Sequence, residues 1–260
     1  MNQIKTLVNN SEVAVIIPVY QEVPGPEEMN CFQNNCKLLS RYPIFLVGPE
    51  GLNVQAYNIQ PGIQTEFFPS GYFKGIRGYN RLMLSKEFYQ RFENYKYILI
   101  CQLDVFVFKD ELNFWCQLNY DYIGAPWIQR QFRILSYVAV KTGFKNALKM
   151  LFTRSISNCV GNGGFSLRKI RAFSDSLKQY KNDAVSWPAN EDFYWSFFAK
   201  IEGKPLSMPD YKMASKFSIE VKPKKLLRLN NNELPMGIHA WGKYEPEVWK
   251  TILKQHGYEY

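Results

Sequence analysis

Apolar residues in the first part of the chain gather in short continuous runs separated by polar segments. The runs at 13–20 (VAVIIPVY) and 43–49 (PIFLVGP) are rich in branched side chains and close with proline or glycine. Continuous runs of this length are typical of strands buried on both faces of a parallel sheet. A short segment at 65–68 and a longer one at 97–108 predict further strands.

Segments with apolar residues at helical spacing lie between these runs. Residues 29–42 (MNCFQNNCKLLSRY) and 79–92 (YNRLMLSKEFYQRF) predict helices. Strands that alternate with helices favour right-handed βαβ units, and therefore an α/β fold with a mostly parallel central sheet flanked by helices. Ligands of such sheets bind outside the carboxyl ends of the strands.

The second half of the chain predicts less regular elements. Residues 120–127 (YDYIGAPW) predict a short strand and turn. Residues 162–168 (NGGFSLR) begin with glycines and predict a strand or the start of a helix. Residues 190–200 (NEDFYWSFFAK) predict a helix with Asn190 as its N-cap and two acids in its first turn. Because the chain has no internal repeat or low-complexity linker, one domain over 1–260 is the simplest division.

Composition narrows the class of protein. The 260 residues are 46% apolar and 16% aromatic, which is ample for a buried core. No uncharged apolar run of about 18 residues exists, and the first residues lack the order of a signal peptide, so we expect a cytoplasmic protein. The five cysteines show no zinc-site spacing, and we expect reduced thiols. With two histidines in the chain, any metal is held mainly by oxygen.

The net charge of +9 favours anionic partners such as nucleotide phosphates or an acidic membrane surface. Nucleic acid is not expected, because no RNA-binding aromatic signature, zinc finger or phosphate loop is present. A basic amphipathic segment at about 130–154 places Lys141, Lys145 and Lys149 on one side of a helix. That helix either packs its apolar face on the domain or lies on an anionic membrane surface.

One acid interrupts the most apolar segment of the chain: Asp104 in YILICQLDVFVF, residues 97–108. A carboxylate in such a run is costly to bury unless a cation or hydrogen-bond donors satisfy it. The position therefore favours a metal ligand. A strand-end acid that meets water or caps a turn is the alternative.

Five segments carry a family resemblance: IIPVY, QLDVF, GNGGFSLR, NEDFYW and GIHAWGKYE. Through them the chain, over about residues 13–245, resembles a little-characterised bacterial family of glycosyltransferases with the nucleotide-diphospho-sugar transferase (GT-A-like, Rossmann-like) fold. The resemblance implies sugar transfer from a nucleoside-diphosphate sugar donor to a saccharide or lipid-linked hydroxyl acceptor, in surface polysaccharide or glycoconjugate synthesis. It also implies a nucleotide-binding half at about 13–110 and an acceptor-side half at about 111–260.

The resemblance implies a divalent cation. QLDVF is similar to the DxD element of these enzymes, with Gln102 in place of the first acid, so Asp104 would coordinate the Mn²⁺ or Mg²⁺ that bridges the diphosphate. His239, in the GIHAWGKYE segment, resembles the histidine that completes the metal shell, and a structural histidine is the alternative. The replacement at Gln102 leaves the affinity for metal open.

The resemblance also implies a catalytic base. NED at 190–192 is similar to the xED element of inverting transferases, in which Asp192 would deprotonate the acceptor hydroxyl and Glu191 would bind acceptor hydroxyls. The alternative is that both acids only stabilise a helix N-terminus, a role that does not exclude the catalytic one. A helix start is expected to lower the pKa of Asp192 and keep it ionised.

Binding residues follow from the same comparison. The expected donor-binding residues are Pro18, Val19, Tyr20, Glu22, Arg77, Tyr79, Asn80, Gln102, Leu103 and Lys243. The expected sugar- or acceptor-binding residues are Asn162, Gly163, Gly164, Phe165, Trp127 and Trp241, the glycines because backbone can approach a sugar ring there. A helix cap at Asn80, a core aromatic at Tyr79, a solvated Lys243 and a plain turn at the glycines are the alternatives.

Two other functions remain open. A sugar nucleotidyltransferase shares the sheet and the metal carboxylates but usually carries a glycine-rich signature after the first strand, where this chain has PVYQEVPGPEE. A non-catalytic nucleotide or carbohydrate binder on the same fold is favoured by Gln102, which stands where a second acid is usual.

Overall fold

The computed structural model describes residues 12–127, 136, 139–140, 143–145, 147–148, 160–179, 184, 186–198 and 206–258. Its centre is a six-stranded sheet in the order β3-β2-β1-β4-β7-β6. The first four of these strands are parallel, and β7 runs antiparallel to both of its neighbours. The strands are β1 (Val13–Pro18), β2 (Ile44–Pro49), β3 (Ile63–Phe68), β4 (Tyr97–Cys101), β6 (Tyr122–Ile123) and β7 (Phe165–Lys169).

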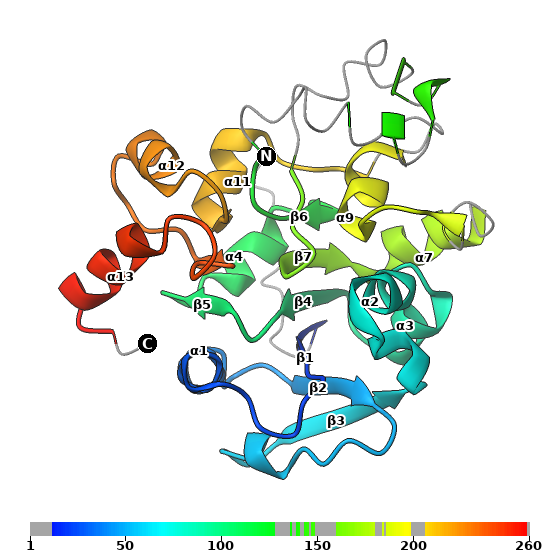
Figure 1. The fold of residues 1–260 in the computed structure, drawn as a ribbon, viewed down its shortest axis with the longest axis horizontal. Helices are drawn as coiled ribbons and strands as arrows, with labels where there is room; N and C mark the ends of the chain where they lie inside the picture. Colours follow the sequence, from blue (N-terminus) through cyan, green and yellow to red (C-terminus); the bar gives the residue numbers. More distant parts are fainter. Residues whose placement is uncertain are drawn as a thin grey trace, which may run out of the picture.

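Helices cover both faces of this sheet (Figure 1). Along β1, Val15 and Ile17 pack toward α1 and α4, whereas Ala14 and Ile16 pack toward α2, α3 and α7. Burial of alternate residues on opposite faces confirms the α/β fold with a mostly parallel sheet that the continuous apolar runs predict. The helices of these layers are α1 (Pro26–Leu38), α2 (Gly75–Met83), α3 (Lys86–Arg91), α4 (Leu112–Gln117) and α7 (Ile170–Gln179).

A smaller three-stranded sheet lies at the side of the first, in the order β5-β9-β8. It consists of β5 (Val105–Val107), β8 (Ser218–Ile219) and β9 (Gly237–His239). The remaining elements of the described part are η2 (Gln55–Tyr57), η3 (Ser70–Phe73), α9 (Glu191–Phe193), the π-helical turn η4 (Tyr194–Phe198), α11 (Tyr211–Phe217), α12 (Pro223–Leu229) and α13 (Pro246–Gln255). None of the helices in the described residues is long and apolar enough to cross a membrane.

The apolar segment 97–108 is not one strand. It breaks after Cys101, turns at residues 103–104 and continues as β5 in the second sheet. The buried Asn35 of α1 holds this turn, because its amide nitrogen donates to the Val105 carbonyl (2.7 Å) and its amide oxygen accepts from Val107 N–H (2.9 Å). The expectation that residues 97–108 form a single strand is therefore wrong. Asp104 lies in a turn, at the carboxyl end of β4.

Two predicted helices also differ from expectation. The helix expected at 79–92 is divided into α2 and α3, because the Ser85 hydroxyl accepts from Phe88 N–H at 3.1 Å and starts a new helix. The helix expected at 190–200 opens as α9 and continues as a π-helical turn. Asn190 stands at its N-cap, but its side chain makes no capping hydrogen bond, and Asn80 instead accepts from Glu191 N–H at 3.3 Å.

Two predictions concern the basic segment and the cysteines. Most of the basic amphipathic segment at 130–154 lies outside the described residues, so it stays a prediction. Four of the five cysteines are described, and all four are free and buried: Cys31, Cys36, Cys101 and Cys116.

Candidate active site

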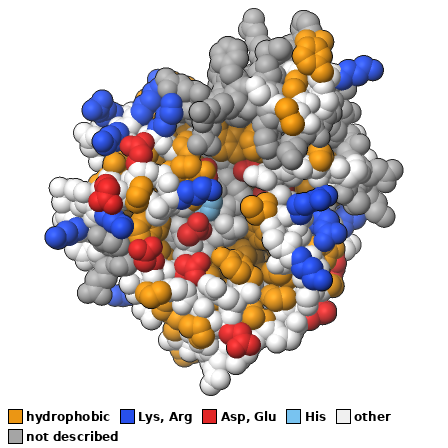
Figure 2. Space-filling view, viewed as in Figure 1, with side chains coloured by type: hydrophobic (Ala, Val, Ile, Leu, Met, Phe, Trp, Pro, Cys, Tyr) orange, Lys and Arg blue, Asp and Glu red, His pale blue; other side chains and the backbone are white. Residues whose placement is uncertain are grey.

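A cleft of about 660 Å³ opens beyond the carboxyl ends of β1 and β4. Its wall includes the turn after β4, the loop before β7, the start of α9 and the end of β9. Figure 2 shows acidic side chains and an imidazole in a hollow near the middle of this face. We call it the acidic cleft, because five acidic residues line it: Glu28, Asp104, Glu191, Asp192 and Glu220.

Asp104 and His239 meet in this cleft. Their Oδ1 and Nε2 atoms lie 3.3 Å apart, and His239 Nδ1 lies 3.8 Å from Glu220 Oε1. The second sheet makes this contact, because Val105 of β5 pairs with His239 of β9. Burial acts to lower the pKa of His239, but the carboxylates of Asp104, Glu220 and Asp192 outweigh it and raise that pKa. Burial acts to raise the pKa of Asp104, which His239 and Lys243 nevertheless hold below its usual value.

Gly164 makes room for the imidazole. A Cβ atom at this position would clash with the imidazole, at 2.1 Å from His239 Nε2, so only glycine fits here without a shift. At Gly163 a Cβ atom would lie 2.6 Å from Glu191 Oε1. The glycine pair therefore serves close approach, as expected, but in the structure the approaching groups are the protein's own imidazole and carboxylate.

Few described side chains of the cleft are placed to act as ligands of a metal ion. Besides Asp104 and His239, the Gln102 amide oxygen lies 3.3 Å from His239 Nε2. Within the described residues there is no group of three or more histidine, cysteine, aspartate or glutamate side chains arranged to hold a metal. Two ionisable ligands and one amide oxygen suit a hard cation whose other ligands come from phosphate and water.

Glu191 is held by an arginine that the sequence motifs did not single out. Arg168 Nη2 lies 2.8 Å from Glu191 Oε1, and both side chains are almost fully buried, with exposed fractions of 0% and 2%. The same guanidinium donates to the Ser166 hydroxyl (3.0 Å) and to the Tyr89 hydroxyl (3.1 Å). In this arrangement Glu191 fixes the start of α9, which places the neighbouring Asp192 in the cleft.

Asp192 has an unusual acidity. Burial, followed by the charges of Glu191 and Glu220, raises its pKa to about 8. A hydrogen bond from Phe193 N–H (2.9 Å) acts in the opposite direction but is outweighed. The expectation that the helix start lowers the pKa of Asp192 is therefore wrong, because burial and the neighbouring carboxylates raise that pKa by more than the hydrogen bond at the helix start lowers it.

Most of the predicted site residues line the acidic cleft. They are Pro18, Tyr20, Tyr79, Asn80, Gln102, Leu103, Asp104, Asn162, Gly163, Gly164, Glu191, Asp192, His239 and Lys243. Asn162 also shapes the loop, because its side-chain oxygen accepts from Gly164 N–H at 2.9 Å. Two acidic residues of the lining were missed, Glu28 and Glu220. Glu220 directly follows β8, so an acid after a strand was the signal, as for Asp104.

Six predicted residues do not line this cleft. Val19 and Trp241 are buried in the core, and Glu22 is exposed elsewhere. Arg77 lines a neighbouring hollow. The two remaining aromatic residues pack on other rings: Phe165 stacks on Phe217 (4.9 Å between centroids) and Trp127 stacks on Phe193 (4.8 Å).

The fold is that of the GT-A glycosyltransferases. The chain superposes on the apo structure of the bifunctional glycosyltransferase WbbM with a TM-score of 0.56 and 12% identity, over 95% of this chain and 48% of that one. It therefore spans about half the length of WbbM. Mouse xyloside xylosyltransferase 1 in its apo form gives a TM-score of 0.51 and 9% identity, over 88% of this chain and 97% of that one.

Sequence comparison assigns the family. The chain belongs to the family described as protein of unknown function DUF5672, whose model matches residues 62–239. No curated protein matches the chain. The matched span contains the turn of Asp104, the Arg168–Glu191 pair, Asp192 and His239.

Proposed function

We propose that this protein is a glycosyltransferase that moves a sugar from a nucleoside-diphosphate sugar to a hydroxyl acceptor with inversion at the anomeric carbon. The observation that carries the proposal is the content of one cleft, where the Asp104–His239 pair and a carboxylate with a raised pKa, Asp192, line the same walls. The GT-A fold supports it, because that fold is shared with known sugar transferases.

The charge of the cleft favours a metal-dependent donor site. Lys243 is the one lysine or arginine among the described residues of its lining, against several carboxylates. A donor diphosphate adds further negative charge, so the cleft would repel it without a cation. Asp104, His239 and the Gln102 amide oxygen would hold Mn²⁺ or Mg²⁺, which neutralises charge on the departing diphosphate when bound. To bind a cation His239 gives up its ring proton, so low pH opposes metal binding.

Asp192 acts as the general base in this proposal. Its ionised carboxylate accepts the proton of the acceptor hydroxyl while that oxygen attacks the anomeric carbon and the bond to the diphosphate breaks. A carboxylate with a pKa of about 8 is a stronger base than an ordinary aspartate, and it is ionised above that pH. The displacement occurs in one step, so no covalent enzyme intermediate forms and the stereochemistry inverts.

Glu191 has a positioning role. Its ion pair with Arg168 occupies one carboxylate oxygen and anchors the first residue of α9. The base therefore stands on a segment whose orientation is set by a buried contact rather than by solvent-exposed groups.

The proposal also covers the acceptor, the cellular location and a membrane contact. The acceptor is a saccharide or lipid-linked saccharide of surface polysaccharide or glycoconjugate synthesis. The protein acts in the cytoplasm, and the segment at 130–154 contacts an anionic membrane surface.

The experiment is a panel of nucleotide sugars with Mn²⁺ and candidate acceptors, with released nucleoside diphosphate as the readout. We expect release by the wild type, and loss in Asp104→Ala and in Asp192→Asn. Asp175→Asn, at an exposed position on α7, is the matched control and should retain activity. Release of pyrophosphate from nucleoside triphosphates would show a nucleotidyltransferase instead. Binding of nucleotide without turnover under any condition would show a non-catalytic binder.

A further inference from the structure

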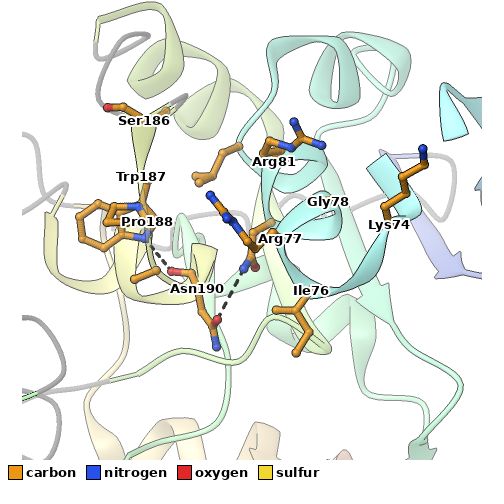
Figure 3. Close-up of a pocket in the computed structure, with 13 residues that line it drawn as sticks. Lys74, Ile76, Arg77, Gly78, Arg81, Ser186, Trp187, Pro188 and Asn190 are labelled. Carbon is orange, nitrogen blue, oxygen red and sulfur yellow. Dashed lines mark hydrogen bonds between the residues drawn. The ribbon is translucent and has the colours of Figure 1, made fainter. Parts of the chain in front are cut away.

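A second hollow lies beside the acidic cleft, between α2 and the segment 186–190 (Figure 3). It measures about 910 Å³ and shares Ile76, Asn80 and Asn190 with the cleft. The side-chain nitrogen of Asn80 donates to the side-chain oxygen of Asn190 at 3.5 Å. The two hollows therefore meet at this asparagine pair, and Asn190 directly precedes the two acids of the site.

The charges of this second hollow have the opposite sign. Three cations contribute to its wall, Lys74, Arg77 and Arg81, and no described lining residue is an acid. We call it the basic groove. Arg81 is held by a hydrogen bond to the Gly71 carbonyl (3.1 Å), whereas Lys74 and Arg77 are exposed and form no ion pair with any described residue. Unneutralised cations in a concave site favour an anionic ligand.

The groove also has an ordered aromatic wall. The Trp187 indole N–H donates to the Asn190 carbonyl at 2.9 Å, and its ring contacts the Tyr194 ring edge-on at 5.5 Å. Arg77 points from α2 toward this segment (Figure 3). Ile76, at the boundary with the acidic cleft, is 72% exposed. A fixed ring and an exposed aliphatic side chain next to guanidinium groups suit a ligand with both apolar C–H faces and an anionic group.

We propose that the basic groove binds the acceptor, and that the acceptor is an acidic saccharide whose carboxylate or phosphate pairs with Arg77 and Lys74. This inference rests on the proposed glycosyltransferase function. The shared Asn80–Asn190 boundary lets one saccharide place its acidic residue in the groove and its reacting hydroxyl at Asp192. The acidic group contributes binding and orientation only, and the proton and bond changes of the transfer are unaltered.

Binding is tested directly by the indole N–H resonance of Trp187 in an NMR spectrum of the full chain, assigned with Trp187→Phe. The probes are matched methyl glycosides: glucuronic acid against glucose, and N-acetylglucosamine 6-phosphate against N-acetylglucosamine, with inorganic phosphate as a separate arm. We expect the acidic glycosides to shift this resonance, and Arg77→Glu to weaken their binding by about tenfold or more, as for a lost charge-assisted hydrogen bond. Lys225→Glu, exposed on α12 on the other side of the molecule (Figure 1), makes the same charge change and should bind as the wild type.

Two results would overturn the inference. One is an acidic glycoside that binds no more tightly than its neutral partner, or equally well to Arg77→Glu and wild type. The other is inorganic phosphate that binds as tightly as the acidic glycosides, which would reduce the groove to a simple anion site.

Failure of the inference is separable from failure of the proposed function. Asp192→Asn should retain binding of the acidic glycosides while transfer is lost. If transfer activity exists but only with neutral acceptors, the groove assignment is wrong and the glycosyltransferase stands. If acidic glycosides bind through Arg77 but no nucleotide sugar is ever turned over, the acceptor role fails with the proposed function.

Discussion

The acidic cleft and the basic groove lie side by side and differ in nearly every physical property. The cleft gathers carboxylates and an imidazole from segments far apart in sequence, and its key groups are buried or half-buried, with perturbed pKa values. The groove draws its charge from exposed residues of and beside one helix, α2. Under the proposed function, these properties suit the cleft to chemistry on a diphosphate and the groove to binding of the acceptor.

The largest expected difference is in turnover. Asp104→Ala should lower kcat/KM by about a thousandfold, since charge neutralisation at a departing phosphate contributes several kcal/mol. Arg77→Ala, in the groove, should leave kcat nearly unchanged and raise KM for acidic acceptors. Steady-state kinetics of both variants with one donor distinguishes these outcomes. An equal fall in kcat in both variants would contradict the separate roles of the cleft in chemistry and of the groove in acceptor binding.

The two arginines should differ in stability. Arg168→Ala should lower the free energy of unfolding by about 3–5 kcal/mol, because it leaves the Glu191 carboxylate buried without its partner. Arg77→Ala, at an exposed position, should change it by less than about 0.5 kcal/mol. Chemical denaturation measures both. The double variant Arg168→Met/Glu191→Met should recover much of the loss, and a double variant as unstable as Arg168→Ala would argue against the ion pair as the cause.

Substitution of two glycines by alanine should have different effects in the cleft and near the groove. Gly164→Ala should cost about 1–3 kcal/mol and disturb the Asp104–His239 contact, because its Cβ atom would overlap the imidazole. At Gly71, near the groove, a Cβ atom meets no other atom within 4 Å, so Gly71→Ala should be nearly neutral. Denaturation midpoints and metal titration of the two variants test this. Unaltered metal binding in Gly164→Ala would show that His239 is not a ligand.

The smallest expected effect is a shift in pH dependence. Glu220→Gln removes a negative charge that raises the pKa of Asp192, so ionisation becomes easier and the rise of kcat/KM with pH moves to lower pH, by on the order of one unit or less. Exposed charges of the groove should not affect this profile, and Lys74→Gln is the control. A shift toward higher pH in Glu220→Gln would contradict the assignment of Asp192.

The fold was largely predictable because its evidence is local. The apolar runs of β1 and β2 are buried on both faces, and each run reports that burial directly. The break between β4 and β5 was not predictable, because it depends on Asn35, which lies more than 60 residues earlier in the chain. The split of the 79–92 helix is an intermediate case, since Ser85 is a local capping signal in an otherwise helical pattern.

The identity of the main site residues could be predicted from the sequence, whereas their ion pairs and pKa values could not. Asp104, Asp192 and His239 were singled out by resemblance to family motifs, and all three line one cleft. The role of Arg168 depends on a partner 23 residues away, and the pKa of Asp192 depends on neighbours such as Glu220, which follows β8. Three-dimensional proximity decides both properties, and no local pattern encodes it.

The central claim is that Asp192 is the base of a sugar transfer in the acidic cleft. It is tested most directly by the pH dependence of kcat/KM for nucleoside diphosphate release, in the wild type and in Asp192→Asn. For the wild type we predict a rise with pH that levels off near the Asp192 pKa of about 8. For Asp192→Asn we predict a loss of about 10²- to 10⁴-fold without that rise. A variant that transfers sugar at the wild-type rate, with the same pH profile, would contradict the account.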